Sequence, residues 1–445
     1  MEHWNIVKKL HDGTIIYRHP FAGTEAWYLP ERKFRPSHTH FHSSSEPLPA
    51  KEKQDYCAFC PAHYKQATPE KSRIELRDGE WHLVDEPTPG HIFSKSAECR
   101  RIGNLYEIIS TNYWKKNYAY ELSAHNRRRQ QAYLADPMGR DHVIALLQQK
   151  AKNTRLDLPK HLGENELRDM SEPFFGGSHE LVIPKRHYVD GADTTGQLCS
   201  TGELTPEEHY FYIKLSCHAI NSIYENNPFV TFVSVYTNWR RDAGASFEHL
   251  HRQVIGVDRL GQHLQNGLEW VRREPTIYQN YVNYVAQNLG FFLCENDHAV
   301  AFVDVGHTFS TVAIYAKSRQ TFPCRFAHAE LKGMSDIIHA VHAAFGPHEA
   351  VNEEWYYPPK NAIAPLPWHV LIKWRNHRHA GIESITEIYP DEYGPDGLKN
   401  ILSERLASLR AAGKIGDICF GNDCSHKKIS LNYHRSSGTE LFAKT

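Results

Sequence analysis

The chain has 445 residues, of which 40% are hydrophobic, and this length provides apolar material for more than one domain. Its 51 Lys and Arg residues balance 52 Asp and Glu residues, which argues against nucleic acid as the partner. The sequence lacks both an apolar run of about 18 residues and the apolar core of a signal peptide. Nine scattered cysteines favour a reducing, cytoplasmic location over a disulfide framework.

The predicted elements mix strands and helices. Residues 16–30 are typical of early strands, whereas residues 62–175 are polar and predict an irregular insert with one basic helical patch, NRRRQQAYLADP. A strand is predicted at HELVIP (179–184). A helix should begin at Pro206, because Thr205 and Glu208 have the spacing of a capping box. The strands FVTFVSVYTN (229–238) and HLHRQVIGV (249–257) follow.

This order of elements occurs a second time along the chain. STVAIYAKSR (310–319) is similar to HELVIPKRH, and residues 353–374 are similar to residues 233–257. A duplicated unit is the simplest explanation. The second copy retains His369 but lacks the pattern H-x-H-x-Q, so only the first copy carries the residues for chemistry. We expect a catalytic repeat at residues 1–258, a degenerate repeat at 259–394 and an extension at 395–445.

The segment YCAFCPAH places Cys57 and Cys60 at the spacing of a zinc half-site, because two such thiolates can share one tetrahedral ion. The sequence has no second C-x-x-C, so the other ligands should be histidines or carboxylates, with His187 and His249 as candidates. A closed site with two cysteines and two histidines would be structural. The alternatives are buried apolar thiols or a redox pair, although the βαβ context of a thioredoxin-like site is missing.

The segment SFEHLHRQVIG carries the candidate nucleophile, His251. A neutral imidazole can attack phosphorus and form a covalent phosphoramidate, provided that an acceptor holds its other nitrogen. On a strand, Gln253 would share the face of His251 and could donate to a phosphate oxygen. The loop NWRRDAGAS adds Asn238, Gly244 and Ser246 as further phosphate contacts. The alternative for an isolated H-x-H is a pair of ordinary core or surface histidines.

Five segments together resemble the galactose-1-phosphate uridylyltransferase branch of the histidine-triad superfamily. They occur in the order of that family and are RKFRP, CAFCPAHYKQATPE, SHELVIPKRH, NWRRDAGASFEHLHRQ and WHVLIKWRNHRHAGIESITEIY. The resemblance implies an α+β fold in which a duplicated histidine-triad-like unit forms mostly antiparallel half-barrel sheets with packed helices. It also implies a homodimer. Gln253 is typical of the transferase branch, whereas the hydrolase branch has a histidine there.

The resemblance also implies a role for each matching residue. His251 would carry the nucleotidyl group, with Gln253 and Ser246 completing the catalytic set. The substrate-binding residues would be Arg32, Arg35, Asn238, Gly244, Ser246 and Gln253, and a structural Zn²⁺ would be held by Cys57, Cys60, His187 and His249.

These roles predict a nucleotidyltransferase that works by a ping-pong mechanism. A nucleoside diphosphate sugar or related nucleotide would donate its nucleoside monophosphate to His251, and a sugar 1-phosphate would accept it. Tyr389 stands where the family's hexose-binding glutamine is expected, as in phosphorylase-like relatives. The first alternative is therefore a sugar-nucleotide or dinucleotide phosphorylase whose acceptor is inorganic phosphate or sulfate. A non-catalytic nucleotide-binding sensor is the second, although binding alone needs no nucleophile.

The C-terminal extension lies outside the resemblance. Its segment CFGNDCSH brings Cys419, Cys424 and His426 close together in sequence. They could bind a second metal ion, although this spacing is atypical of zinc sites. The alternative is a surface extension with ordinary cysteines.

Overall fold

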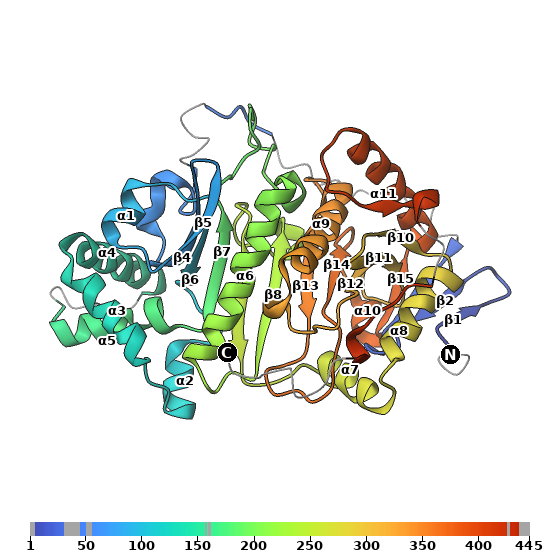
Figure 1. Ribbon diagram of the computed structural model, residues 1–445, viewed down its shortest axis with the longest axis horizontal. Helices are drawn as coiled ribbons and strands as arrows, with labels where there is room; N and C mark the ends of the chain where they lie inside the picture. The colour runs from blue at the N-terminus through green and yellow to red at the C-terminus, as the bar shows by residue number, and fades with distance from the viewer. Residues whose placement is uncertain are drawn as a thin grey trace.

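The computed structural model describes residues 5–30, 45–49, 56–155, 158, 162–424 and 428–435. Its largest element is a 12-stranded antiparallel sheet in the order β16-β10-β11-β12-β14-β13-β8-β9-β7-β6-β4-β5 (Figure 1). The strands are β4 (Glu70–Arg77), β5 (Glu80–Asp85), β6 (Cys99–Gly103), β7 (His179–Pro184), β8 (Phe232–Trp239), β9 (Arg252–Val257), β10 (Phe292–Glu295), β11 (Ala299–Asp304), β12 (Thr311–Ala316), β13 (Val351–Tyr356), β14 (His369–Trp374) and β16 (Cys419–Phe420).

The large sheet consists of two similar halves that meet where β8 pairs with β13. One half has the order β8-β9-β7-β6-β4 and the other the order β13-β14-β12-β11-β10. Each half contributes one long helix, α6 (Pro206–Asn226) or α9 (His328–Phe345), and the two helices lie side by side on one face (Figure 1). The α+β class and the duplication are therefore confirmed. The boundaries at residues 258 and 394 stay predictions, because the sheet runs through both halves.

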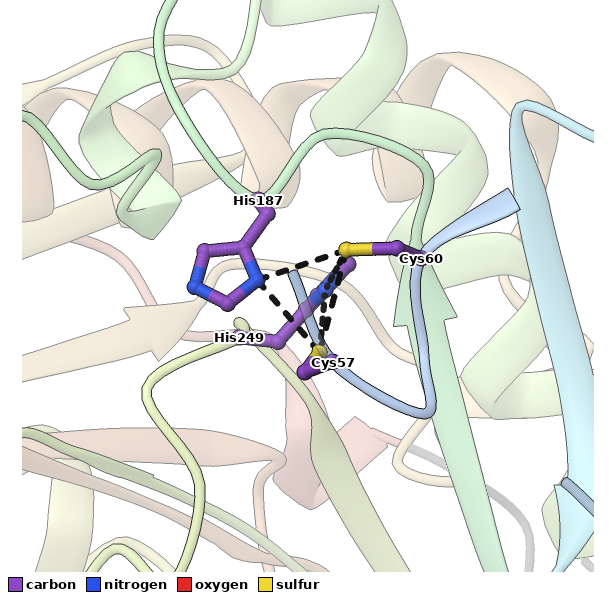
Figure 2. A group of neighbouring side chains, drawn as sticks. All are labelled: Cys57, Cys60, His187 and His249. Atoms are coloured by element: carbon purple, nitrogen blue, oxygen red, sulfur yellow. Dashed lines mark hydrogen bonds between the residues drawn. The ribbon is translucent and has the colours of Figure 1, made fainter. Parts of the chain in front are cut away.

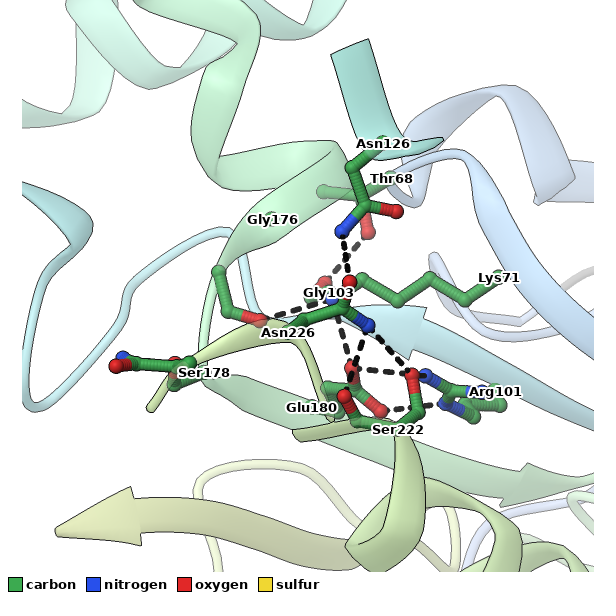
Figure 3. A network of polar contacts seen from close by, with 12 residues as sticks. Thr68, Lys71, Arg101, Gly103, Asn126, Gly176, Ser178, Glu180, Ser222 and Asn226 are labelled. Carbon is green, nitrogen blue, oxygen red and sulfur yellow. Dashed lines mark hydrogen bonds and ion pairs between the residues drawn. The ribbon is translucent and has the colours of Figure 1, made fainter. Parts of the chain in front are cut away.

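The described residues within 62–175 form regular strands and helices, and the prediction of an irregular insert was wrong. They form β4, β5 and β6, which extend the sheet, and a group of helices beyond its edge (Figure 1). The pattern was missed because β4 buries charged side chains: Lys71 lies 2.7 Å from Glu180, and Arg101 also binds that carboxylate (Figure 3). The helices are α1 (Pro89–Ser94), α2 (Thr111–Tyr118), α3 (Ala124–Ala135), α4 (Pro137–Thr154) and α5 (Glu164–Gly176).

A second, four-stranded sheet pairs the first three described strands with β15. It has the order β1-β2-β3-β15, and β15 runs parallel to β3. The early strands predicted within residues 16–30 correspond to two of these strands. The remaining strands and α-helices of the described chain are β1 (Val7–Lys9), β2 (Ile15–Arg18), β3 (Glu25–Tyr28), β15 (Ile388–Asp391), α7 (Gln262–Arg273), α8 (Ile277–Val282), α10 (Gly381–Thr386) and α11 (Gly394–Ala411).

The C-terminal extension is integrated into the fold, because β16 pairs with β10. In the described part of the chain, neither Cys419 nor Cys424 belongs to a cluster that could hold a metal ion. His426 lies outside the described residues. None of the helices in the described ranges combines the length and apolar character needed to span a bilayer.

A buried ion pair connects the two halves of the large sheet. Arg252 of β9 donates from Nη2 to Glu353 Oε1 of β13 at 2.6 Å, and both side chains are fully buried. His342 of α9 contacts the other carboxylate oxygen at 2.8 Å. Burial would raise the pKa of Glu353, but Arg252 and His342 hold it far below its ordinary value. Arg252 also donates to Ser216 of α6, so it faces the helix layer.

We expect Glu353→Ala to lower the free energy of unfolding by about 3–5 kcal/mol, because it leaves the Arg252 charge buried without its partner. Chemical denaturation of the purified protein measures this loss. The control is Glu269→Ala, which breaks exposed pairs with Arg272 and Arg273 and should leave the midpoint nearly unchanged. If the two variants unfolded at the same denaturant concentration, the ion pair between Arg252 and Glu353 would not stabilise the fold.

Candidate functional site

Four side chains that could hold a metal ion come from three distant segments and meet beside the first half of the sheet (Figure 2). Cys57 and Cys60 lie in the turn that precedes β4, His187 follows β7, and His249 precedes β9. The two sulfur atoms are 3.8 Å apart. Nδ1 of His187 lies 3.4 and 3.5 Å from the sulfurs, and Nδ1 of His249 lies 3.5 and 3.9 Å from them.

These distances fit a tetrahedral zinc ion. Bond lengths of about 2.3 Å to sulfur and 2.0–2.1 Å to nitrogen give tetrahedral edges of about 3.8 Å between sulfurs and about 3.5 Å between sulfur and nitrogen. The second nitrogen of His249 also has a fixed role, because Nε2–H donates to the carbonyl of Pro184 at 2.8 Å. That bond leaves Nδ1 unprotonated and available to a metal. The predicted ligand set can therefore hold a metal ion.

A second group, His19, Asp304 and His307, also brings possible metal ligands together, and sequence reasoning missed it. The hydrogen bonds of this group are not those expected of a metal site. The backbone N–H of Ala22 donates to His19 Nδ1 at 2.9 Å, so the proton of this neutral ring is on Nε2. Asp304 accepts bonds from Tyr281 and His307 at 2.5 and 2.8 Å. Burial lowers the pKa of His19 to about 4. The contacts of this group instead hold the β2–β3 turn against the second half of the sheet.

The candidate nucleophile, His251, lies immediately before β9 rather than within it. The predicted strand from residue 249 thus begins three residues later, at Arg252. Nδ1–H of His251 donates to the carbonyl of His249 at 2.8 Å, which leaves the Nε2 lone pair free. The residue is 5% exposed, and burial lowers its pKa. The ring is therefore neutral near pH 7, as a nucleophilic imidazole must be.

The side chain of Gln253 is fixed in one orientation by two hydrogen-bond donors. Tyr236 O–H and His179 Nε2–H donate to Gln253 Oε1 at 2.9 and 3.1 Å. The backbone N–H of Ile108 donates to His179 Nδ1 at 3.1 Å, which places the ring proton on Nε2. Burial lowers the pKa of His179 to about 4, so it is neutral. Within the described ranges, nothing accepts a bond from the Gln253 amide nitrogen, which can donate to an anion.

A second amide has the same arrangement at the end of β8. Asn238 Oδ1 accepts a hydrogen bond from Asn352 Nδ2 at 2.7 Å, which leaves its own Nδ2 as a donor. Gly244 has φ +87°, and a Cβ placed there would lie only 3.8 Å from Asn238 Nδ2. The structure thus brings these two predicted residues together. Ser246 lies in the same loop and is exposed, and Arg32 and Arg35 lie outside the described residues.

Sequence reasoning missed the residues that orient the two amides. Tyr236 lies directly opposite Gln253 in the register of β8 and β9, and Asn352 lies opposite Asn238 in the register of β13 and β8. The only sequence signal was that His179 begins the predicted strand HELVIP. A strand pattern predicts which face a side chain takes, but pairing across strands depends on the register.

Two solved structures are similar to this chain along most of its length. An ADP-glucose phosphorylase from Arabidopsis thaliana with bound ADP-glucose matches with a TM-score of 0.54 and 14% identity, over 88% of this chain and 98% of that one. A galT-like protein from the same plant matches with a TM-score of 0.52, 14% identity and the same coverage. The predicted fold, that of galactose-1-phosphate uridylyltransferase relatives, is therefore confirmed. No curated protein matches the sequence. A family model matches residues 10–433, and the chain belongs to that family, which is described as Domain of unknown function (DUF4921).

Proposed function

We propose that this protein is a nucleotidyltransferase that moves a nucleoside monophosphate between phosphate-bearing sugars. The observation that carries the proposal is the combination of a neutral, anchored His251 with two amides whose oxygen atoms are already engaged. The imidazole supplies a nucleophile, and the free N–H groups of Gln253 and Asn238 can stabilise charge that develops on a phosphate.

The reaction would have two displacements. In the first, His251 Nε2 attacks the α-phosphorus of a nucleoside diphosphate sugar, and the bond from that phosphorus to the bridging oxygen breaks. The sugar 1-phosphate leaves with the bonding electrons. The positive charge that the imidazole acquires faces the carbonyl of His249, which accepts its Nδ1–H. In the second, a phosphate oxygen of the acceptor attacks the same phosphorus, and the nitrogen–phosphorus bond breaks.

The metal would serve this chemistry indirectly. Cys57, Cys60, His187 and His249 form a closed set of four ligands, so a bound zinc ion would be structural. By fixing His249, these residues would also fix the carbonyl that orients His251. We expect one zinc ion per chain.

A phosphorylase is the second candidate, with inorganic phosphate or sulfate as the acceptor in the second displacement. Tyr389 favours it, because an aromatic side chain occupies the position where we expect a hexose-binding glutamine in a transferase. The ring of Tyr389 packs against His379, with centroids 5.1 Å apart. The similar ADP-glucose phosphorylase also suggests adenine nucleotides as donors to test. The predicted homodimer and cytoplasmic location stay predictions.

Intact-protein mass spectrometry tests the proposal. The protein would be mixed with a panel of sugar nucleotides and dinucleotides in the absence of any acceptor. A mass increase of one nucleoside monophosphate is the expected result, and the donor that produces it identifies the base. Adding a sugar 1-phosphate, inorganic phosphate or sulfate should then discharge the adduct and distinguish the two candidates. Nucleotide binding without any adduct would instead favour the sensor.

We expect Gln253→Glu to slow adduct formation by about 10²- to 10³-fold, the usual effect of losing one oxyanion donor. The glutamate can still accept bonds from Tyr236 and His179, so the fold should be kept, but its charge would repel the substrate phosphate. Rapid-quench measurement of the adduct gives the rate, and circular dichroism checks the fold. A wild-type rate in the folded variant would mean that this side chain does not contact the phosphate.

A further inference from the structure

The second half of the sheet has a histidine, His369, that corresponds to His251, but neighbouring side chains cover its ring. His369 Nδ1–H donates to the carbonyl of Pro367 at 2.9 Å, which repeats the bond from His251 to the residue two positions before it. The His369 ring lies between Tyr315 and Tyr356, with centroid distances of 4.5 and 5.1 Å and interplanar angles of 8°. Tyrosine rings thus cover both faces of the imidazole. The second half also contacts the loop NWRRDAGAS (238–246), here called the phosphate loop, and that contact needs another explanation.

We infer that Asn352 and Arg375 of the second half are positioning residues that fix the orientation of Asn238 in the first half. The inference rests on the proposed function, because it assigns Asn238 a task in phosphate binding. Asn352 belongs to β13, which pairs with β8, and Arg375 directly follows β14. Asn352 lies outside the motifs that predicted the site, and Arg375 lies within the last of them but was given no role there.

All hydrogen-bonding groups of the Asn352 side chain have a partner in the described structure. Its Nδ2 donates to Asn238 Oδ1 at 2.7 Å and to the carbonyl of Ala243 at 2.8 Å. Its Oδ1 accepts from Arg375 Nη1 at 2.7 Å. A reversed Asn352 amide would face two acceptors with its oxygen and Arg375 with its nitrogen. The contacts therefore allow one orientation.

The fixed amide determines two features of the phosphate loop. Asn238 must keep its oxygen toward Asn352, so its Nδ2 stays beside Gly244. The bond to Ala243 also ties the loop backbone to β13, immediately before the left-handed Gly244 at φ +87°. Arg375 is held in turn by the ring of Phe309, 4.3 Å from the guanidinium carbon. A relay of three side chains thus connects the second half to the site of group transfer.

The test compares Asn352→Asp with wild type in single-turnover formation of the nucleotidyl adduct. The aspartate has the same shape but no N–H groups, and its oxygens repel Asn238 Oδ1 and the Ala243 carbonyl. Asn238 should then turn its oxygen toward the phosphate. We expect the maximal rate of adduct formation to fall on the order of 10²-fold, the usual result of a small misplacement of reacting groups. The donor concentration for half-maximal rate should change by less than about threefold, because the sugar and base contacts remain.

Three further variants distinguish a loss of positioning from a general disturbance of the fold. Arg375→Met removes the donor to Asn352 and should slow the maximal rate about tenfold, whereas Arg375→Lys keeps a charged donor and should restore most of it. The control is Glu354→Gln on the same face of β13. Glu354 accepts bonds from Lys373 and Tyr356 and does not contact the phosphate loop. This control should keep the wild-type rate even if its Tm falls as much as that of Asn352→Asp.

The outcomes also separate this inference from the proposed function. If Asn352→Asp forms the adduct at the wild-type rate, the inference is overturned and the proposed function stands. An equal loss of rate in Glu354→Gln would also overturn the inference, because the loss would then come from a general disturbance of β13. If wild type forms no adduct, the proposed function fails. The inference, which assigns Asn238 a task in that reaction, then fails with it.

Discussion

His251→Ala should abolish the nucleotidyl adduct that wild type forms with its donor. We expect a rate at least on the order of 10⁴-fold lower, because no other nucleophile shares the anchored geometry of this imidazole in the described site. Intact mass spectrometry after extended incubation measures any residual adduct. The free energy of unfolding should change little by comparison, since His251 makes one side-chain hydrogen bond and lies beside the loop rather than within the sheet.

His369→Gln is the matched control for this variant. It removes the equivalent histidine of the second half, which lies between two tyrosine rings. We expect it to lower Tm, because it disturbs a buried cluster, while the adduct still forms at His251. An adduct on His251→Ala, or its absence from His369→Gln, would mean that the nucleophile has been assigned to the wrong half.

Removal of the metal should lower both the stability of the protein and its rate of adduct formation. Wild type should contain one zinc per chain by elemental analysis, and Cys60→Ser should contain almost none. Structural zinc contributes folding free energy directly, so we expect Tm to fall by at least about 5 °C. The rate of adduct formation should fall about 10- to 100-fold, because the carbonyl that anchors His251 belongs to His249, a proposed ligand.

Cys199→Ser provides the comparison for the zinc variant. Cys199 is fully buried but lies outside the four-residue cluster. This variant should keep its zinc, and its adduct should form at the wild-type rate. If Cys60→Ser retained one zinc per chain and the wild-type Tm, Cys60 would not be a ligand and the proposed site would be wrong.

The metal cluster shows what sequence alone could predict. Cysteines and histidines in recognisable motifs carry their chemistry in their identity, so Cys57, Cys60, His187 and His249 could be grouped without knowledge of the path between them. The fold brings all four together. The strand HELVIP and the helix from Pro206 were also confirmed, because apolar runs and caps are local signals.

The orientation of the two amides could not be predicted in the same way. Gln253 and Asn238 were identified by motif, but the donors that aim them, Tyr236 and Asn352, lie on neighbouring strands. The insert at 62–175 was misjudged because its strand β4 buries paired charges instead of apolar side chains. Local patterns carry no information on register or on charge pairs formed by distant segments.

The parallel pairing of β3 with β15 has a consequence for the order of folding. β3 (Glu25–Tyr28) is synthesised long before its partner at Ile388–Asp391. During translation, one edge of the β1-β2-β3 sheet must therefore stay open until Asp391 has left the ribosome. Open strand edges favour association with other chains, so nascent or C-terminally truncated forms should be more prone to aggregation than the complete protein.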